Sequence, residues 1–138
     1  MRLRKDAKVE LIRGVPLFAR CSRKEAEAIA HVADEIDLPE GTELTHEGDT
    51  GREFMVIVEG EAEVTRDGRE LRTLGPGDCV GEIALLTKSP RTATVTATTP
   101  VRALVLTDRA FRRMIEEQPV IAAKVLETLA ERLAPSAI

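Results

Sequence analysis

The most constraining feature of this chain is a stretch over residues 33–107 in which apolar and polar side chains alternate with a period close to two. Turn-forming residues interrupt the alternation about every 8–12 residues, which is typical of an all-β sandwich or barrel. Turns are expected at residues 39–41, 47–49, 59–60, 67–68, 75–78 and 99–100. The strand-like runs cover residues 54–58, 62–65, 70–74, 93–97 and 101–106. Asp67 and Gly68, between two such runs, predict a type I′ hairpin turn.

Helical patterns flank this stretch on both sides. Residues 5–13 have the pattern of a short amphipathic helix that ends near Gly14. Ser22 and Glu25 have the spacing of a capping box, which predicts a second helix up to about His31.

Two further helices are expected after the β pattern. The first begins at Asp108, a suitable N-cap residue, and Pro119 ends it. The second covers residues 120–133. Its apolar stripe is expected to consist of Ile121, Val125, Leu129 and Leu133.

The length of 138 residues corresponds to one domain. We expect a single domain over residues 1–138, with a helical part at 1–32, a β-roll at 33–107 and C-terminal helices at 108–134. A hydrophobic content of 43% and a charged content of 32% agree with a globular protein that forms its own core.

The charge pattern argues against a polyanionic partner. The net charge is −4, and residues 25–63 hold thirteen acidic residues against Arg52 alone. Such an acidic segment repels DNA and RNA. Aromatic residues make up only 2% of the chain, too few for a surface that stacks on bases. We therefore expect no nucleic-acid binding.

Sequence signals also bear on the compartment. No apolar run approaches the roughly 18 residues of a membrane helix, and the basic start lacks the apolar region of a signal peptide. The two cysteines, Cys21 and Cys79, have neither a disulfide framework nor metal-ligand spacing, which indicates a reducing compartment. We expect a cytoplasmic protein without a membrane partner.

One segment interrupts the β pattern. Residues 81–86 begin with glycine and continue with good helix formers, which predicts a short helix. The first turn of a helix attracts anions through its N–H groups and its dipole. Arg91 adds a planar guanidinium that suits a phosphate, and Glu82 adds a carboxylate that can accept a sugar hydroxyl. An apolar wall is expected from Leu74, Val80 and Ile83. Together these residues indicate a nucleotide pocket.

The segment resembles the phosphate-binding cassette of the cyclic-nucleotide-binding domain family, whose members include catabolite activators, protein-kinase regulatory subunits and gated channels. The family pattern of Gly-Glu-(Leu/Ile)-Ala-Leu, followed by Pro-Arg-x-Ala-(Thr/Ser)-Val, stands here at residues 81–85 and 90–95. The resemblance extends over nearly the whole chain. It implies a mainly β fold, a jelly-roll β-roll of about eight strands with N-terminal helices and two C-terminal helices.

The resemblance also implies a ligand, cAMP or cGMP, and no cofactor. Arg91 would bind the exocyclic phosphate oxygens and Glu82 the ribose 2′-hydroxyl, while backbone amides would complete the phosphate shell. The implied binding residues are Val80, Gly81, Glu82, Ile83, Ala84, Arg91, Thr92 and Ala93. A threonine at the position of Thr92 is often associated with cGMP in the family, although members with it also take cAMP. We expect cAMP first, with cGMP tolerated.

Two alternatives stay open. A jelly roll that has lost its ligand would serve as an interaction or dimerisation scaffold. A cupin-like metalloenzyme would need a His-x-His motif, whereas this chain has only the separated His31 and His46. No nucleophile elbow or phosphate-binding lysine loop occurs either, so the expected protein is a sensor and not an enzyme.

The last helix suggests how binding is transmitted. Its apolar stripe suits either the mouth of the roll or the same helix of a second copy, and both partners stay open. The second would make a homodimer through the C-terminal helix, and the effector stays unknown. A catabolite activator continues into a helix-turn-helix. Because the sequence ends at Ile138, we expect no DNA-binding or kinase-linked part.

Overall fold

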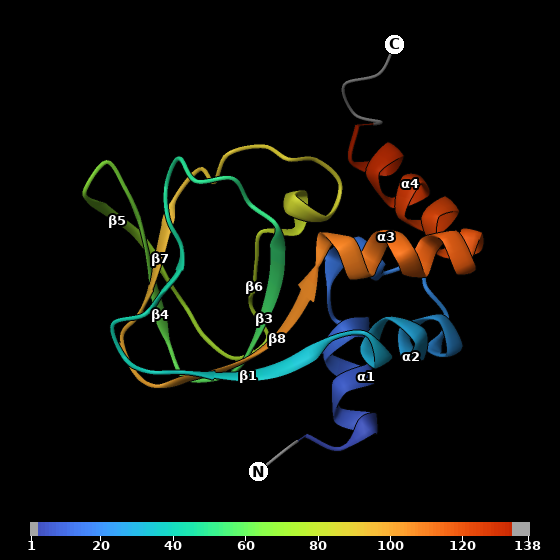
Figure 1. Ribbon diagram of the computed structural model, residues 1–138, viewed down its shortest axis with the longest axis horizontal. Helices are drawn as coiled ribbons and strands as arrows, with labels where there is room; N and C mark the ends of the chain where they lie inside the picture. The colour runs from blue at the N-terminus through green and yellow to red at the C-terminus, as the bar shows by residue number, and fades with distance from the viewer. Residues whose placement is uncertain (1–2, 134–138) are drawn as a thin grey trace. The chain divides into compact units, whose positions relative to one another are not determined.

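The computed structural model describes residues 3–133, and the chain forms two compact units (Figure 1). One unit, Ala33–Arg109, is built mainly from strands and is called the β unit below. The other combines Met1–Val32 with Ala110–Ile138 and is called the helical unit. Residue 134, the expected end of the last helical segment, lies outside the described residues.

The β unit consists of two four-stranded antiparallel sheets. The first has the order β1-β8-β3-β6, with the bounds Asp34–Leu38, Val101–Thr107, Glu53–Glu59 and Cys79–Val80. The second has the order β2-β7-β4-β5, with the bounds Glu43–Thr45, Thr94–Ala97, Ala62–Arg66 and Arg69–Leu74. Eight strands in these two sheets form a jelly roll. The expected class, a mainly β roll with flanking helices, is confirmed.

Both sheets contribute to one apolar core. Alternate residues of the central strands point inward, as a two-residue period requires. The buried members of this core are Leu44, Met55, Ile57, Ala62, Leu74, Val95, Ala97, Val101, Ala103 and Val105. The partly buried Val64 and Val80 pack against it and lie where the core meets a cavity described below.

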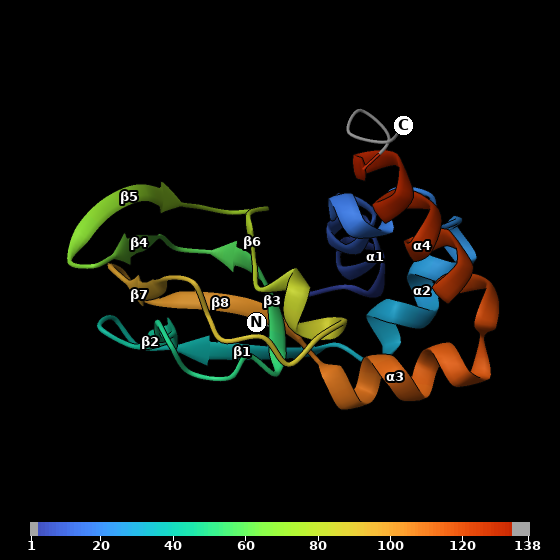
Figure 2. The same ribbon diagram turned by 90° about the horizontal axis from the view of Figure 1, so that it is seen from above.

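β4 and β5 form the predicted hairpin. The two strands lie side by side, and the turn that joins them is at the left edge of Figure 2. Asp67 and Gly68 have φ values of +52° and +76°, and a type I′ turn needs positive φ at both positions.

The hairpin contains a β-bulge. Thr65 pairs with Glu70, whereas the next pair is Val64 with Arg72, so Leu71 is an extra residue in β5. Leu71 is 49% exposed. A bulge reverses which residues face inward beyond it, and Arg72 therefore lies on the inner face beside Val64.

The helical unit contains α1 (Lys5–Arg13), the short 3₁₀ helix η1 (Pro16–Phe18), α2 (Arg23–His31), most of α3 (Asp108–Glu117) and α4 (Pro119–Leu133). Its core includes Phe18 and Phe111, whose ring centroids are 6.0 Å apart. Within residues 3–133, no helix is long and apolar enough to cross a membrane, and no group of three or more His, Cys, Asp or Glu side chains could hold a metal ion.

The apolar stripe predicted for the last helix is partly wrong. Ile121 and Val125 are buried as expected, but Thr128 continues the buried face, and Leu133 is 68% exposed. The cause is helical geometry. With 3.6 residues per turn, each step of four residues rotates a position by about 40°, so a strict four-residue repeat drifts off the buried face within three steps.

Glu25 connects two helices of this unit. Its side chain accepts a hydrogen bond from the backbone N–H of Ser22 at 2.8 Å, and the Ser22 hydroxyl accepts one from the N–H of Glu25 at 3.2 Å, which confirms the capping box. Lys124 on α4 donates to the same carboxylate at 2.5 Å. The hydrogen bond from Lys124, followed by the one from Ser22, lowers the pKa of Glu25 below its ordinary value.

We expect Glu25→Ala to lower the free energy of unfolding by about 1–2 kcal/mol at neutral pH, because it removes half of a capping box and the partner of Lys124. The pKa of Glu25 is lowered on folding. Its contribution is therefore complete above the ordinary glutamate pKa of about 4.3 and disappears as the pH falls through the lowered value.

Urea unfolding of both proteins at about pH 7 and about pH 2.5 measures this difference. Glu116→Ala, at an exposed position of α3, is the control. A loss of equal size at both pH values would contradict the prediction.

Candidate functional site

The segment predicted to bind an anion lies between β6 and β7. Gly81 has a φ of +79°, a conformation that favours glycine, and η2 (Glu82–Leu85) follows as one turn of 3₁₀ helix. The N–H of Ala84 donates to the carbonyl of Gly81 at 2.9 Å. A short helix thus forms within the predicted residues 81–86, but it covers only four of them and is a 3₁₀ turn, because so few residues cannot sustain α-helical hydrogen bonding.

The side chain of Arg91 is held between two glycines. Its Nη2 donates a hydrogen bond to the carbonyl oxygen of Glu53 at 2.6 Å. A Cβ atom at Gly51 would lie 2.9 Å from both Cζ and Nε of Arg91, and one at Gly81 would overlap its Nη1. Any side chain at either glycine would therefore displace the guanidinium.

The backbone of Arg91 is fixed as well. Its N–H donates to the carbonyl of Asp49 at 2.7 Å, and its carbonyl accepts from the N–H of Gly48 at 2.9 Å. Thr50 and Pro90 form an isolated antiparallel bridge beside these bonds. The position of Arg91 is thereby tied to the loop that connects β2 and β3.

The guanidinium of Arg91 is a half-buried charge. Burial lowers the pKa of Arg91, and the negative charge of Glu53 acts against this shift. An arginine nevertheless stays protonated at neutral pH. Among residues 3–133, no carboxylate lies within 4.0 Å of this guanidinium. A partly desolvated cation without an adjacent anion favours the binding of one.

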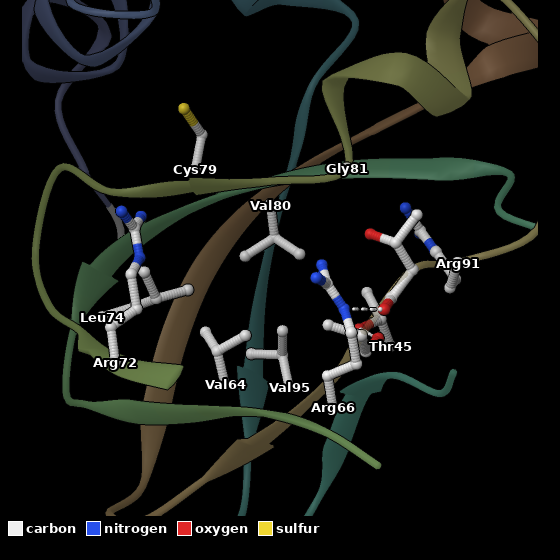
Figure 3. Close-up of a pocket in the computed structure, with 12 residues that line it drawn as sticks. Thr45, Val64, Arg66, Arg72, Leu74, Cys79, Val80, Gly81, Arg91 and Val95 are labelled. Carbon is white, nitrogen blue, oxygen red and sulfur yellow. Dashed lines mark hydrogen bonds between the residues drawn. The ribbon is translucent and has the colours of Figure 1, made fainter. Parts of the chain in front are cut away.

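A cavity of about 240 Å³ opens beside Arg91 (Figure 3). Val64 and Val95 lie side by side beneath Val80 and make its apolar part. The lining residues are Thr45, Val64, Arg66, Arg72, Leu74, Cys79, Val80, Gly81, Arg91, Thr92, Ala93 and Val95.

A second cavity, of about 320 Å³, shares part of this wall. Its lining residues are Cys79, Gly81, Glu82, Ala84, Ser89, Pro90, Arg91 and Thr92. The Oε2 atom of Glu82 is buried. Glu82 and Arg91 therefore border the same cavity. A ligand with a sugar hydroxyl beside a phosphate needs this arrangement, in which the carboxylate can accept from the hydroxyl and the guanidinium can bind the phosphate.

Side chains also anchor the strand that follows Arg91. The hydroxyl of Thr45 donates to the carbonyl of Ala93 at 3.0 Å, and Nε of Arg66 donates to the carbonyl of Thr92 at 2.8 Å. The side chain of Thr92 is itself exposed. These two bonds hold the residues after the arginine in a defined position along the cavity.

The structure brings most of the predicted binding residues together. Val80, Gly81, Arg91, Thr92 and Ala93 line the first cavity, and Glu82 and Ala84 line the second. Ile83 lies in η2, and its side chain is outside the described part of the structure.

Sequence reasoning missed several residues near Arg91. They are Thr45, Gly51, Val64, Arg66, Arg72 and Val95. Alternation along β4 places Val64 and Arg66 on one face and would have indicated both. The sequence carries no signal for Gly51, which approaches Arg91 only in the folded chain.

Comparison with known proteins places this geometry in context. The family model described as cyclic nucleotide-binding domain matches residues 35–118. A CRP-like cAMP-activated global transcriptional regulator of Mycobacterium tuberculosis is 31% identical over 129 residues, which cover 90% of this chain and 58% of that protein. A cAMP-dependent protein kinase regulatory subunit of Mycosarcoma maydis is 40% identical over 113 residues, which cover 73% of this chain and 21% of that protein.

A solved structure shows the same fold. The N-terminal domain of a transcriptional regulator from Streptomyces coelicolor A3(2) is 34% identical, with a TM-score of 0.83, and the match covers 91% of this chain and 94% of that domain. The present chain spans 58% or less of the length of the two curated relatives. The resemblance inferred from the cassette is confirmed, and the chain belongs to the cyclic nucleotide-binding domain family.

Proposed function

We propose that this chain binds a cyclic purine mononucleotide, cAMP or cGMP, without converting it, and acts as a regulatory module. The half-buried guanidinium of Arg91 carries the proposal, because it borders two cavities with no carboxylate within 4.0 Å among residues 3–133. The names of the mycobacterial and fungal relatives refer to cAMP, which supports this class of ligand.

The proposed ligand lies with its phosphate on Arg91. The guanidinium then exchanges the carbonyl of Glu53 for the phosphate oxygens, which suit its planar fork. Glu82 accepts the ribose hydroxyl, and Val80 packs against the purine. The backbone amides of Ile83 and of Thr92 or Ala93 complete the phosphate shell in this arrangement. The amide of Ala84 joins them only when its bond to Gly81 opens.

Arg91→Ala tests this arrangement. Hydrogen bonds to charged groups contribute about 1.5–3 kcal/mol, so we expect the variant to bind roughly ten- to a hundredfold more weakly. The unfolding midpoint without nucleotide should change little, since no carboxylate loses a partner. Isothermal calorimetry and thermal unfolding measure both effects, and Lys88→Ala, which removes an exposed charge from the same loop, is the control.

The same measurements address the ligand-free scaffold. A nucleotide at 100 times its dissociation constant stabilises the native state by about 2.7 kcal/mol, which thermal unfolding detects. If millimolar cAMP and cGMP leave the wild-type midpoint and calorimetric baseline unchanged, the chain is a scaffold. If Arg91→Ala binds like the wild type, the ligand lies elsewhere.

A second substitution tests the position of the guanidinium without removing it. Gly51 does not need a left-handed backbone, so Gly51→Ala introduces no backbone strain, but its Cβ would push Arg91 out of place. We expect an affinity loss of about tenfold, corresponding to about 1.4 kcal/mol, at nearly unchanged stability.

Gly75→Ala is the matched control for that experiment. A Cβ atom at Gly75 has no neighbour within 4 Å, and its backbone is not left-handed either. Calorimetry of the three proteins gives the comparison. An unchanged affinity of Gly51→Ala would show that the glycine does not position Arg91.

The proposed module also includes a homodimer through α4. Leu126 and Leu133 are 66% and 68% exposed and stand seven residues apart, the repeat by which paired helices pack. Sedimentation should show a dimer for the wild type and a monomer for Leu126→Glu. Gln118→Glu adds the same charge at an exposed position before α4 and should stay dimeric. A wild-type monomer at high concentration would refute the dimer.

A further inference from the structure

The loop before Arg91 contains a serine that the proposed function does not use. Ser89 is exposed and lies in the irregular segment between η2 and β7. Its hydroxyl shares a hydrogen bond of 2.7 Å with the hydroxyl of Thr87, and its N–H donates to the same threonine oxygen at 3.3 Å. Both bonds stay within three residues of chain, so a change at the Ser89 hydroxyl disturbs only the loop.

Ser89 and Thr99 are the two hydroxyl residues of the sequence that stand directly before a proline. Their hydroxyl groups differ in accessibility. The Thr99 hydroxyl accepts a hydrogen bond from the N–H of Glu61 at 3.0 Å and donates one to the carbonyl of Pro100 at 3.0 Å. A covalent change at Thr99 would therefore break two contacts that involve the backbone, whereas one at Ser89 would break only the bond to Thr87. Exposed, irregular segments are also where other proteins reach a chain most easily.

Ser89 and Arg91 lie on the same side of the chain. Pro90 forms an isolated antiparallel bridge with Thr50, and the carbonyl of Ser89 accepts from the N–H of Gly51 at 3.4 Å. This segment is therefore extended, and in an extended chain the side chains at i and i+2 point to the same face, with Cα atoms about 7 Å apart. Both side chains accordingly line the second cavity.

The charges of this cavity favour an added phosphate beside Arg91. Among the lining residues Arg91 is the single cation and Glu82 the single acid. A phosphoserine carries a charge of about −1.5 to −2 at pH 7 and has three strong acceptor oxygens. Hydrogen bonds between a guanidinium and a phosphate are stronger than bonds to a neutral carbonyl, so a phosphate on Ser89 would take Arg91 from the carbonyl of Glu53. A ligand phosphate needs the same exchange.

We propose that Ser89 is a phosphorylation site and that its phosphate binds Arg91 in place of the ligand phosphate, so that the modified chain releases its nucleotide. This regulation rests on the proposed function, because it acts through the arginine assigned to the ligand. In the reaction the Ser89 oxygen forms a bond to the γ-phosphorus of ATP, and the bond from that phosphorus to the bridging oxygen breaks. ADP and the hydroxyl proton leave, and a protein kinase supplies the catalysis.

Labelling tests whether Ser89 is accessible to such an enzyme. The full chain is incubated with radiolabelled ATP and a protein kinase that modifies serine or threonine before proline. We expect phosphate to be incorporated into the wild type and not into Ser89→Ala, and peptide mapping should place it at Ser89. No label at Ser89, or label at Thr99 instead, overturns the site.

Phosphorus NMR tests the contact with Arg91, on the full chain with phosphoserine introduced at position 89 during translation. The second pKa of phosphoserine is about 6, and an adjacent cation lowers it. We expect titration to give a value about one unit lower, and the Arg91→Ala substitution to restore the value of about 6. This measurement needs no nucleotide. A pKa near 6 with Arg91 present overturns the contact.

Calorimetry with cAMP and cGMP tests the exclusion of nucleotide. Phosphoserine at position 89 should weaken binding roughly ten- to a hundredfold, as Arg91→Ala does, because both changes remove the guanidinium from the ligand. In Arg91→Ala the same modification should weaken binding clearly less, because the group that it captures is absent. A phosphoserine in place of Gln118, an exposed residue that lines neither cavity, adds the same charge and should leave binding unchanged.

The outcomes separate this proposal from the proposed function. If the wild type binds nucleotide and the chain with phosphoserine at position 89 binds it equally well, the regulation is overturned and the proposed function stands. An equal loss in the wild-type and Arg91→Ala backgrounds would mean charge repulsion alone, which also overturns the regulation. If the wild type binds neither nucleotide, the proposed function fails and the exclusion of nucleotide fails with it.

Discussion

The half-buried charge of Arg91 is the constraint on which the surrounding structure depends. A guanidinium loses hydration when it is partly buried, and here one backbone carbonyl, that of Glu53, replaces some of the lost water. The space for the group exists because Gly51 and Gly81 have no side chains. Gly51 and Gly81 thus make no side-chain contacts of their own, and their lack of a side chain leaves room for the guanidinium of Arg91. The loop before β3 is hydrogen-bonded to the backbone of Arg91.

Local features of the sequence predicted their structures well because the responsible contacts lie within a few residues. Asp67 and Gly68 can adopt positive φ at low energetic cost, and the type I′ turn forms as predicted. Ser22 and Glu25 complete a capping box by themselves. The cassette was recognisable because its glycine, carboxylate and arginine occur within one short segment. Its binding roles remain predictions.

The features that the sequence did not reveal depend on contacts between distant segments or on small geometric offsets. Gly51 and Arg91 are forty positions apart in the sequence. Only in the folded β unit do they come so close that a side chain at position 51 would displace the guanidinium of Arg91. The apolar repeat of the last helix has the right composition but the wrong period, so Leu133 rotates away from the core. Simple alternation from the hairpin turn would place Leu71 inside, whereas the bulge places Arg72 there.

That bulge has an evolutionary consequence. The cavity wall at β5 is determined by the number of residues in the hairpin as much as by their identity. A regular ladder at this point would place Leu71 opposite Val64 in place of Arg72, so a change of length in β5 that moves the bulge exchanges a cationic side chain for an apolar one on the inner face. Hairpins accept insertions and deletions more readily than sheet interiors do. In related chains, insertions or deletions in this hairpin can therefore change which side chain lines the cavity, and with it the ligand, without any substitution of the lining residues themselves.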